Sequence, residues 1–242
     1  MAPILQLDAI SKRFGAVVVA DGLDLVVPQG EALGVIGPNG AGKTSLFGMI
    51  TGTLPQDGGR VLFRGEDLAG LSPAARCRRG VARSFQVPQP FGGMSVFENL
   101  AVAAEFGCAD RSGDLAASCG EILERCGLID QANRPAGSLT LLQRKRLELA
   151  RALATRPQLL LLDEVAGGLT DEECHALVSL VRDVKETGVT IIWIEHIVHA
   201  LVAVVDRLVV LHGGAFIADG EPREVIRRPQ VREIYLGIPA NA

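Results

Sequence analysis

A nine-residue glycine-rich loop lies between two apolar segments and constrains the fold of the chain more than any other feature. Its sequence, GPNGAGKTS, fits the pattern G-x-x-x-x-G-K-[ST]. Glycine lets backbone N–H groups approach phosphate oxygens closely, and the lysine adds a positive charge. The pattern therefore predicts a nucleoside triphosphate site formed by Gly37, Pro38, Asn39, Gly40, Ala41, Gly42, Lys43, Thr44 and Ser45.

Two acidic residues at the end of an apolar run complement this loop. The run LLLLDE places Asp163 and Glu164 after four leucines, a pattern typical of a strand buried on both faces of a parallel sheet. Lys43 is expected to pair with the β- and γ-phosphates, and Asp163 to hold Mg²⁺ together with the Thr44 hydroxyl. Glu164 is then placed to orient or deprotonate the attacking water. The two motifs together predict nucleotide hydrolysis.

A second apolar run, TIIWIEH, ends at His196. From the end of a buried strand, an imidazole can donate a hydrogen bond to the γ-phosphate. A structural histidine whose hydrogen bonds are satisfied inside the protein is the alternative. Because Glu195 precedes His196, the pair His196 and His199 does not form the H-E-x-x-H zinc pattern.

Composition narrows the class of protein. The 242 residues are 48% hydrophobic, enough to bury a substantial core, and the net charge of −4 gives no electrostatic reason to expect nucleic acid as a partner. The basic clusters at 76–79 and 144–146 are expected on solvated helix faces. Five cysteines without C-x-x-C spacing fit a reducing cytosol. Without a signal peptide or an apolar run of roughly 18 residues, any membrane role is expected to come through a partner.

Hydrophobic periodicity predicts an α/β chain with a helical insert in its middle. Strands are expected at 4–10, 16–27, 32–36, 60–64, 80–85, 158–163 and 189–195, with a hairpin at 206–219. Helices are expected at 43–52, after Gly137, at 171–187 and at 222–236. The stretch 95–133 is expected to be mostly helical, with breaks near Gly107 and Gly113.

Five segments, taken in order and spacing, resemble one family. They are GPNGAGKTS, ARSFQ, LTLLQ, LLLLDE and IEH, and they look like the nucleotide-binding subunit of an ATP-binding-cassette (ABC) transporter over nearly the whole chain. The segments ARSFQVPQPFGGMSVFENL, DRLVVLHGG and VREIYLG more closely resemble the ATPases of branched-chain amino-acid importers. The ATPase of lipopolysaccharide export, which shares the ending and overall size, is the nearest rival.

The resemblance implies further site residues. Gln86 matches the glutamine that touches Mg²⁺ or the attacking water and reports the nucleotide state to the membrane subunits. Phe14 matches an aromatic residue that stacks on adenine, and a core position is the alternative for this phenylalanine. The signature segment, which contacts the ATP of a partner ATPase subunit, corresponds to Leu139, Thr140, Leu141, Leu142 and Gln143.

The chain departs from the family pattern at four positions. Thr140 and Leu142 stand where the signature usually has Ser and Gly, Val165 replaces Pro, and Thr170 replaces Asn or Asp. These changes leave nucleotide binding intact and bear on the efficiency of hydrolysis. A regulatory subunit that holds ATP but hydrolyses little is therefore a second hypothesis.

The resemblance implies an α/β fold of the P-loop NTPase type found in ABC ATPases, with a mixed core sheet, an N-terminal antiparallel β region and a helical subdomain. We expect a nucleotide-binding core at 1–85 and 157–219, a helical subdomain at 86–156 and a C-terminal helical tail at 220–242. Two ATPase subunits, identical or paralogous, would sandwich two ATP molecules at the cytoplasmic face of the inner membrane. Closure would pull on integral permease subunits docked near Gln86, and a periplasmic binding protein would supply the solute.

An ABC protein acting on nucleic acid or ribosomes is a third class. Such proteins usually carry two cassettes in one chain, and this chain has one phosphate-loop motif. The motif count and the negative charge disfavour that class.

Overall fold

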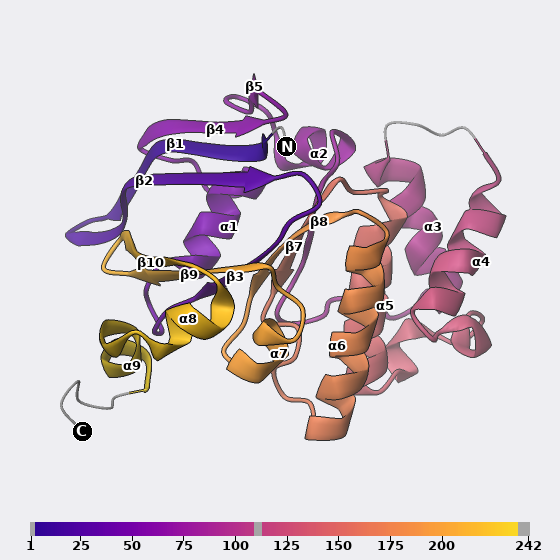
Figure 1. Ribbon diagram of the computed structural model, residues 1–242. Coiled ribbons are helices and arrows are strands. Elements are labelled where there is room, and N and C mark those ends of the chain that lie inside the picture. The colour runs from indigo at the N-terminus through magenta and orange to yellow at the C-terminus, as the bar shows by residue number, and fades with distance from the viewer. Residues whose placement is uncertain (1–2, 109–112, 237–242) are drawn as a thin grey trace.

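The strands form two separate sheets in the computed structural model of the chain (Figure 1). The structure describes residues 3–108 and 113–236; the end of the expected C-terminal tail, 237–242, lies outside this description. Within the described residues, no helix combines the length and apolarity needed to cross a membrane.

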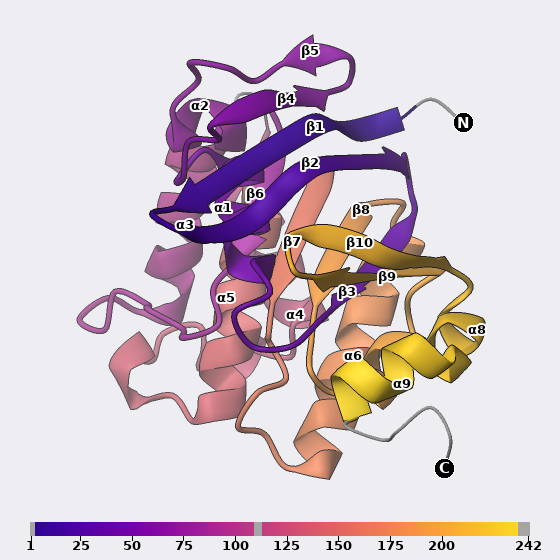
Figure 2. The same cartoon turned by 90° about the vertical axis from the view of Figure 1, so that its left-hand side faces the viewer.

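The first sheet is antiparallel and is built by the N-terminal part of the chain. Its strand order is β2-β1-β4-β5, and Figure 2 shows β1, β2 and β4 running side by side. Alternate residues of β2, such as Leu23, Leu25 and Val27, are buried, as expected for a sheet with one face on the core. The strands are β1 (Pro3–Phe14), β2 (Val17–Pro28), β4 (Gly58–Phe63) and β5 (Glu66–Asp67).

The second sheet has six strands in the order β10-β9-β3-β8-β7-β6. All neighbours pair in parallel except β9 and β10, which form the predicted hairpin. The mixed core sheet expected from the sequence is therefore present. Its strands are β3 (Ala32–Ile36), β6 (Val81–Ser84), β7 (Leu159–Asp163), β8 (Thr190–Ile194), β9 (Arg207–His212) and β10 (Ala215–Gly220).

The six-stranded sheet is the central layer of three (Figure 1). One face packs on α1 (Lys43–Thr51) and the antiparallel sheet, and the other on α5 (Leu141–Ala154) and α6 (Asp171–Glu186). Leu160 and Leu162 of β7 belong to the core beneath α5 and α6, whereas Leu159 and Leu161 belong to the core around α1. Burial on both faces explains the continuous apolar runs of the central strands.

The remaining helices lie around this framework. In Figure 1, α3 and α4 stand with α5 at one side of the sheet. Reciprocal capping boxes begin α3 at Ser95, α5 at Thr140 and α6 at Thr170. The other helices are α2 (Pro73–Arg78), α3 (Val96–Gly107), α4 (Leu115–Arg125), α7 (Val198–Val202), α8 (Pro222–Arg227), α9 (Pro229–Leu236) and the 3₁₀ turns η1 (Ile129–Gln131) and η2 (Ala136–Ser138).

The expected fold class is confirmed, but the helix expected at 222–236 is divided into α8 and α9, and two side chains expected to be exposed are buried. The strand at 32–36 and the break after Gly107 lie where predicted. However, Arg76 and Lys145, predicted on solvated helix faces, are 5% and 4% exposed. Arg76 is buried because its guanidinium donates to the Met49 and Ile50 carbonyls, at 2.8 and 3.0 Å, at the end of α1, where helical carbonyls lack partners within the helix. Lys145 is buried against two backbone carbonyls described below.

Candidate functional site

Four parallel strands end at the same edge of the central sheet, and the predicted site residues follow them. The glycine-rich loop follows β3, Gln86 follows β6, Glu164 follows β7 and His196 follows β8. In open α/β sheets, ligands bind at the carboxyl ends of the strands. Sequence motifs separated by up to about 160 positions therefore meet because of the parallel topology.

The loop can be built only with glycine at two of its positions. Gly42, directly before α1, has φ 102°, and a Cβ there would lie 2.4 Å from the Val19 carbonyl oxygen. At Gly37, a Cβ would lie 2.1 Å from the Leu211 carbonyl oxygen. Side chains at these positions would force the loop away from its neighbours. With the loop held close, the first N–H groups of α1 and their positive dipole face the cavity beside them.

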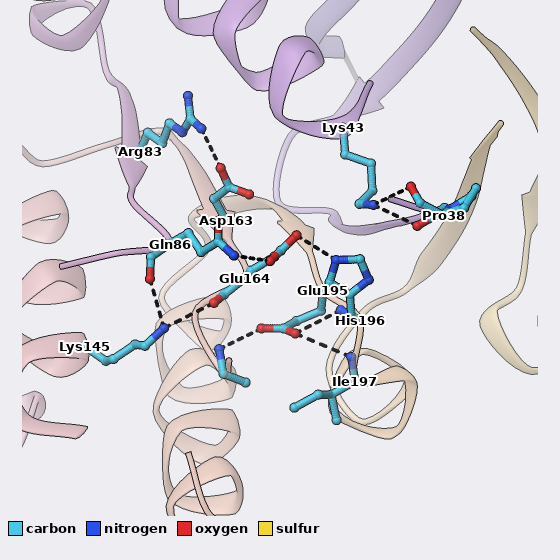
Figure 3. A network of polar contacts seen from close by, with 12 residues as sticks. Pro38, Lys43, Arg83, Gln86, Lys145, Asp163, Glu164, Glu195, His196 and Ile197 are labelled. Carbon is cyan, nitrogen blue, oxygen red and sulfur yellow. Dashed lines mark hydrogen bonds and ion pairs between the residues drawn. The ribbon is translucent and has the colours of Figure 1, made fainter. Parts of the chain in front are cut away.

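Lys43 points back across the loop (Figure 3). Its Nζ donates to the carbonyl oxygens of Gly37 at 2.7 Å and Pro38 at 3.1 Å. Burial lowers the pKa of Lys43, and the nearby charges of Glu164 and Asp163 oppose that shift. The ammonium is thus held over the loop, where a phosphate group would meet a cation and backbone donors together.

Asp163 provides a buried carboxylate beside the loop. Its Oδ2 accepts from Arg83 at 2.5 Å, and the residue is 3% exposed. Within the described part of the chain, its Oδ1 is buried without a hydrogen-bond partner. Thr44, Gln86 and Asp163 line one cavity of 460 Å³. This set of oxygen donors with an unsatisfied carboxylate atom fits a magnesium ion.

Glu164 is the centre of a polar cluster (Figure 3). Gln86 Nε2 donates to Glu164 Oε2 at 2.5 Å, and His196 Nε2 lies 2.7 Å from Glu164 Oε1. Glu164 also has φ 47°, a left-handed conformation that costs a non-glycine residue of the order of 1–3 kcal/mol. The structure therefore brings together three residues that the sequence suggested separately, and it orients the acid in a strained turn.

Phe14 lies on the wall of the main cavity, outside the core. Its ring is 49% exposed, and Lys12 Nζ is 5.5 Å from the ring centroid. Burial in the core, the alternative weighed from sequence, is therefore wrong for this residue. The cavity measures 620 Å³, and its wall comprises Phe14, Val19, Asn39, Gly40, Ala41, Gly42, Lys43, Thr44, Ser45, Gln86, Glu164 and His196.

The segment from Leu139 to Gln143 lies apart from these residues. None of the described residues that line the 620 Å³ cavity comes from 139–143. Thr140 caps α5, since its Oγ1 accepts from Gln143 N at 3.3 Å, and it remains exposed. Leu141 is 44% exposed, and Leu142 is half-buried. The segment presents the exposed start of a helix, and it does not complete the cavity of its own chain.

Three charged residues of the site were not predicted from the sequence. Arg83 pairs with Asp163, Lys145 donates to the carbonyl oxygens of Gln86 and Glu164, and Glu195 accepts from backbone N–H groups. The available signal was a charge inside an otherwise apolar pattern, as at Arg83 between Ala82 and Ser84 or at Glu195 after TIIWI. Such charges are buried only with partners.

Known proteins share the sequence and the fold of this chain. The profile of the ABC transporter family matches residues 20–167. The high-affinity branched-chain amino acid transport ATP-binding protein BraF of Pseudomonas aeruginosa is 36% identical, over 97% of this chain and 98% of the relative. LivG of Escherichia coli K12, which carries the same description, is 34% identical over 97% of this chain and 98% of its own length.

The fold is also found among solved structures. An ATP-binding cassette of an ABC transporter in its ADP conformation superposes with a TM-score of 0.89 at 33% identity, covering 98% of this chain and 100% of that one. A nucleotide-free cassette gives a TM-score of 0.88 at 33% identity, with coverage of 98% and 100%. The resemblance and fold class predicted from the motifs are confirmed. The chain belongs to the ABC transporter family and is one of its ATPase subunits.

Proposed function

We propose that this ATPase subunit powers an importer of branched-chain or related amino acids and amides. One observation carries the proposal: the chain matches ATP-binding proteins of branched-chain amino acid transport over 97% of its length. These relatives favour amino-acid import over the alternative of lipopolysaccharide export, which rested on the shared chain ending and size. The amino-acid relatives are similar to this chain through both the core and the helical segment 86–156, which we treat as one subdomain.

ATP binds in the 620 Å³ cavity, with adenine on the exposed ring of Phe14 and the phosphates along the loop. Lys43 and the backbone N–H groups at the start of α1 neutralise the β- and γ-phosphates. The Thr44 hydroxyl, the Asp163 carboxylate and the Gln86 amide oxygen would hold Mg²⁺, which would balance the phosphate charge. The unsatisfied Oδ1 of Asp163 supports this assignment.

Hydrolysis follows from the cluster around Glu164. The Glu164 carboxylate accepts a proton from water while the water oxygen bonds to the γ-phosphorus and the bond to the β-γ bridging oxygen breaks. His196 donates a hydrogen bond to the γ-phosphate. Gln86 responds to whether the γ-phosphate is bound. The contacts of Glu164 with Gln86 and His196, at 2.5 and 2.7 Å, keep these three groups within reach of one reacting centre.

A second ATPase subunit, identical or paralogous, completes the site. The segment from Leu139 to Gln143, in which Thr140 and Leu141 are exposed, faces the ATP held by that subunit, and the reverse contact serves this chain. Phe85, Val87 and Phe91 beside Gln86 are 49%, 65% and 48% exposed. This apolar surface supports docking of integral permease subunits here, at the cytoplasmic face of the membrane. A periplasmic binding protein acts indirectly, through the permeases.

Reconstituted transport tests the proposal. The chain, its partner ATPase and the permeases are placed in proteoliposomes with the binding protein and ATP. We expect ATP-dependent uptake of labelled leucine, isoleucine or valine, and none with Lys43→Ala. Uptake of an unrelated solute, or movement in the export direction, would contradict the assignment.

A further inference from the structure

Two buried, oppositely charged side chains lie behind the nucleotide site (Figure 3). Lys145 of α5 is 4% exposed, and Glu195, after β8, is 1% exposed. Neither belongs to the described lining of the 620 Å³ cavity. Burying charges carries a large desolvation penalty, so contacts with ATP do not explain their presence. Their own partners are all backbone groups next to the site.

Lys145 joins the ends of two strands through one ammonium group. Its Nζ donates to the carbonyl oxygen of Gln86, after β6, at 3.0 Å and to that of Glu164, after β7, at 3.3 Å. Because Lys145 lies in the second turn of α5, the same side chain ties the start of this helix to both peptides. The helix that begins with the signature segment is thereby connected to the proposed base.

Glu195 holds the same turn from the other side. Its Oε1 accepts from Ala166 N at 2.7 Å, and its Oε2 accepts from His196 N at 3.0 Å. Ala166 follows Glu164 by two positions, so a cation binds the carbonyl at one end of the turn and an anion binds the N–H at the other. Burial lowers the pKa of Lys145, whereas the charges of Glu195 and Glu164 raise it.

The turn itself needs such external contacts. Glu164 has φ 47°, a conformation that L-residues adopt only when the surroundings enforce it. The next residue is Val165, and without a proline ring its backbone is not locked by covalent structure. The left-handed turn that orients the Glu164 carboxylate therefore depends on the groups that form hydrogen bonds with its backbone.

We propose that Lys145 and Glu195 are positioning residues that hold the Glu164 turn in its catalytic conformation. Lys145 also transmits displacement of the start of α5 to Glu164 and Gln86. The inference rests on the proposed role of Glu164 as the base. Neither residue touches the reacting atoms, so their loss changes the rate of the chemical step and leaves ATP binding in place.

Single-turnover phosphate release by the full-length chain tests this role. Lys145→Met keeps most of the unbranched side chain and removes its donors. We expect a fall in the single-turnover rate of about 30- to 100-fold, because a displacement near 1 Å at a catalytic group costs about 100-fold. Affinity for a fluorescent ATP analogue should stay within about threefold. Lys145→Arg restores the donors and should recover most of the rate.

Glu195→Gln tests the other half of the pair. The variant replaces one of the two acceptor oxygens with an N–H₂ group, which would face a backbone N–H donor. The rate should fall in the same direction, with affinity retained. Lys185→Met is the matched control, because Lys185 also donates to a backbone carbonyl, Val204 O at 2.9 Å, but joins α6 to the segment before β9. Urea unfolding of all variants distinguishes a variant that no longer folds from one that folds but hydrolyses ATP more slowly.

The double variant decides whether Lys145 acts through Glu164. In the Glu164→Gln background, Lys145→Met should lower the residual rate by less than about threefold, since residues acting as a unit are not additive. An independent further fall, a normal rate for Lys145→Met, or no rescue by Lys145→Arg would each overturn the inference. If Glu164→Gln alone keeps the wild-type rate, Glu164 is not the base. That result contradicts the proposed function and is distinguishable from a failure of the positioning role of Lys145.

Discussion

We expect nucleotide affinity to depend most directly on Lys43. Its ammonium contacts the carbonyls of Gly37 and Pro38 at 2.7 and 3.1 Å and lies where the phosphates are expected. Lys43→Ala removes a charge-assisted contact worth about 1.5–3 kcal/mol, so ATP affinity should fall by about 10- to 150-fold and turnover should vanish. Equilibrium binding of a fluorescent ATP analogue measures the first effect. Unchanged affinity together with unchanged turnover would exclude the loop from the mechanism.

Phe14 gives a residue-scale test of adenine recognition. Its half-exposed ring lines the 620 Å³ cavity. Phe14→Ala should weaken ATP-analogue binding by about 2- to 12-fold, the equivalent of 0.5–1.5 kcal/mol of stacking, and Phe14→Tyr should retain it. Phe106→Ala removes a ring of 66% exposure on α3 and serves as the control. Equal affinity of wild type and Phe14→Ala for the ATP analogue would mean that adenine does not stack on Phe14.

Sequence patterns identified the residues that face the cavity and missed those that support them. Lys43, Asp163 and Glu164 occur in motifs whose spacing is fixed by one loop or one strand end. Lys145 and Glu195 bind backbone groups, and backbone groups leave no trace in the residue pattern. Their partners are also distant in sequence, as Glu195 is from Ala166, and so they become visible only after the strands are placed side by side.

At the scale of elements, the start of α5 carries the largest departure from the family signature. Thr140 uses Oγ1 as an acceptor for the helix cap, which leaves its O–H able to donate. In the proposed closed dimer, Leu142 would put a bulky side chain where a backbone N–H must approach a phosphate. If one charge-assisted hydrogen bond is lost from the closed state, turnover falls by about 10- to 150-fold. We therefore expect the isolated subunit to be a slow ATPase.

Leu142→Gly should raise phosphate release or ATP-driven dimerisation, alone or combined with Thr140→Ser. Leu142→Ala is the control, because it shortens the side chain without the backbone freedom of glycine, which costs about 1 kcal/mol in a helix. Each protein is assayed alone and with the partner ATPase, since a partner with an intact signature would serve this chain's loop. No gain in either setting would mean that the leucine is accommodated.

The elements were predictable where pattern and packing agree. The central strands were predicted correctly from the sequence because burial on both faces gives continuous apolar runs, as in β3 and β7. The short α2 and β5 were missed, although Ser72 and Pro73 form a helix start. β1 continues to Phe14, beyond the predicted end, because Phe14 pairs with Val17 across the turn. Such extensions depend on pairing between strands, which local periodicity does not reveal.

At the scale of the whole molecule, we propose that one chain presents two incomplete halves of an ATP site. The 620 Å³ cavity is lined by the loop, Glu164 and His196, whereas the segment from Leu139 to Gln143 lies outside its described lining. In the proposed dimer, two subunits arranged around a two-fold axis would bring each half to its complement. ATP would then stabilise the closed pair, and hydrolysis would release it, which would convert a local reaction into motion of the permeases.

The most direct test of this account is the ATP-dependent association of Glu164→Gln. The amide cannot accept the proton from water, so ATP should bind but persist, and the closed dimer should accumulate. Size-exclusion chromatography with light scattering, with ATP and with ADP, compares wild type and Glu164→Gln, each alone and with the partner ATPase, while phosphate release is followed in parallel. We predict a stable dimer only for Glu164→Gln with ATP, and negligible phosphate release. A variant that stays monomeric in both settings and hydrolyses ATP at the wild-type rate would contradict the account.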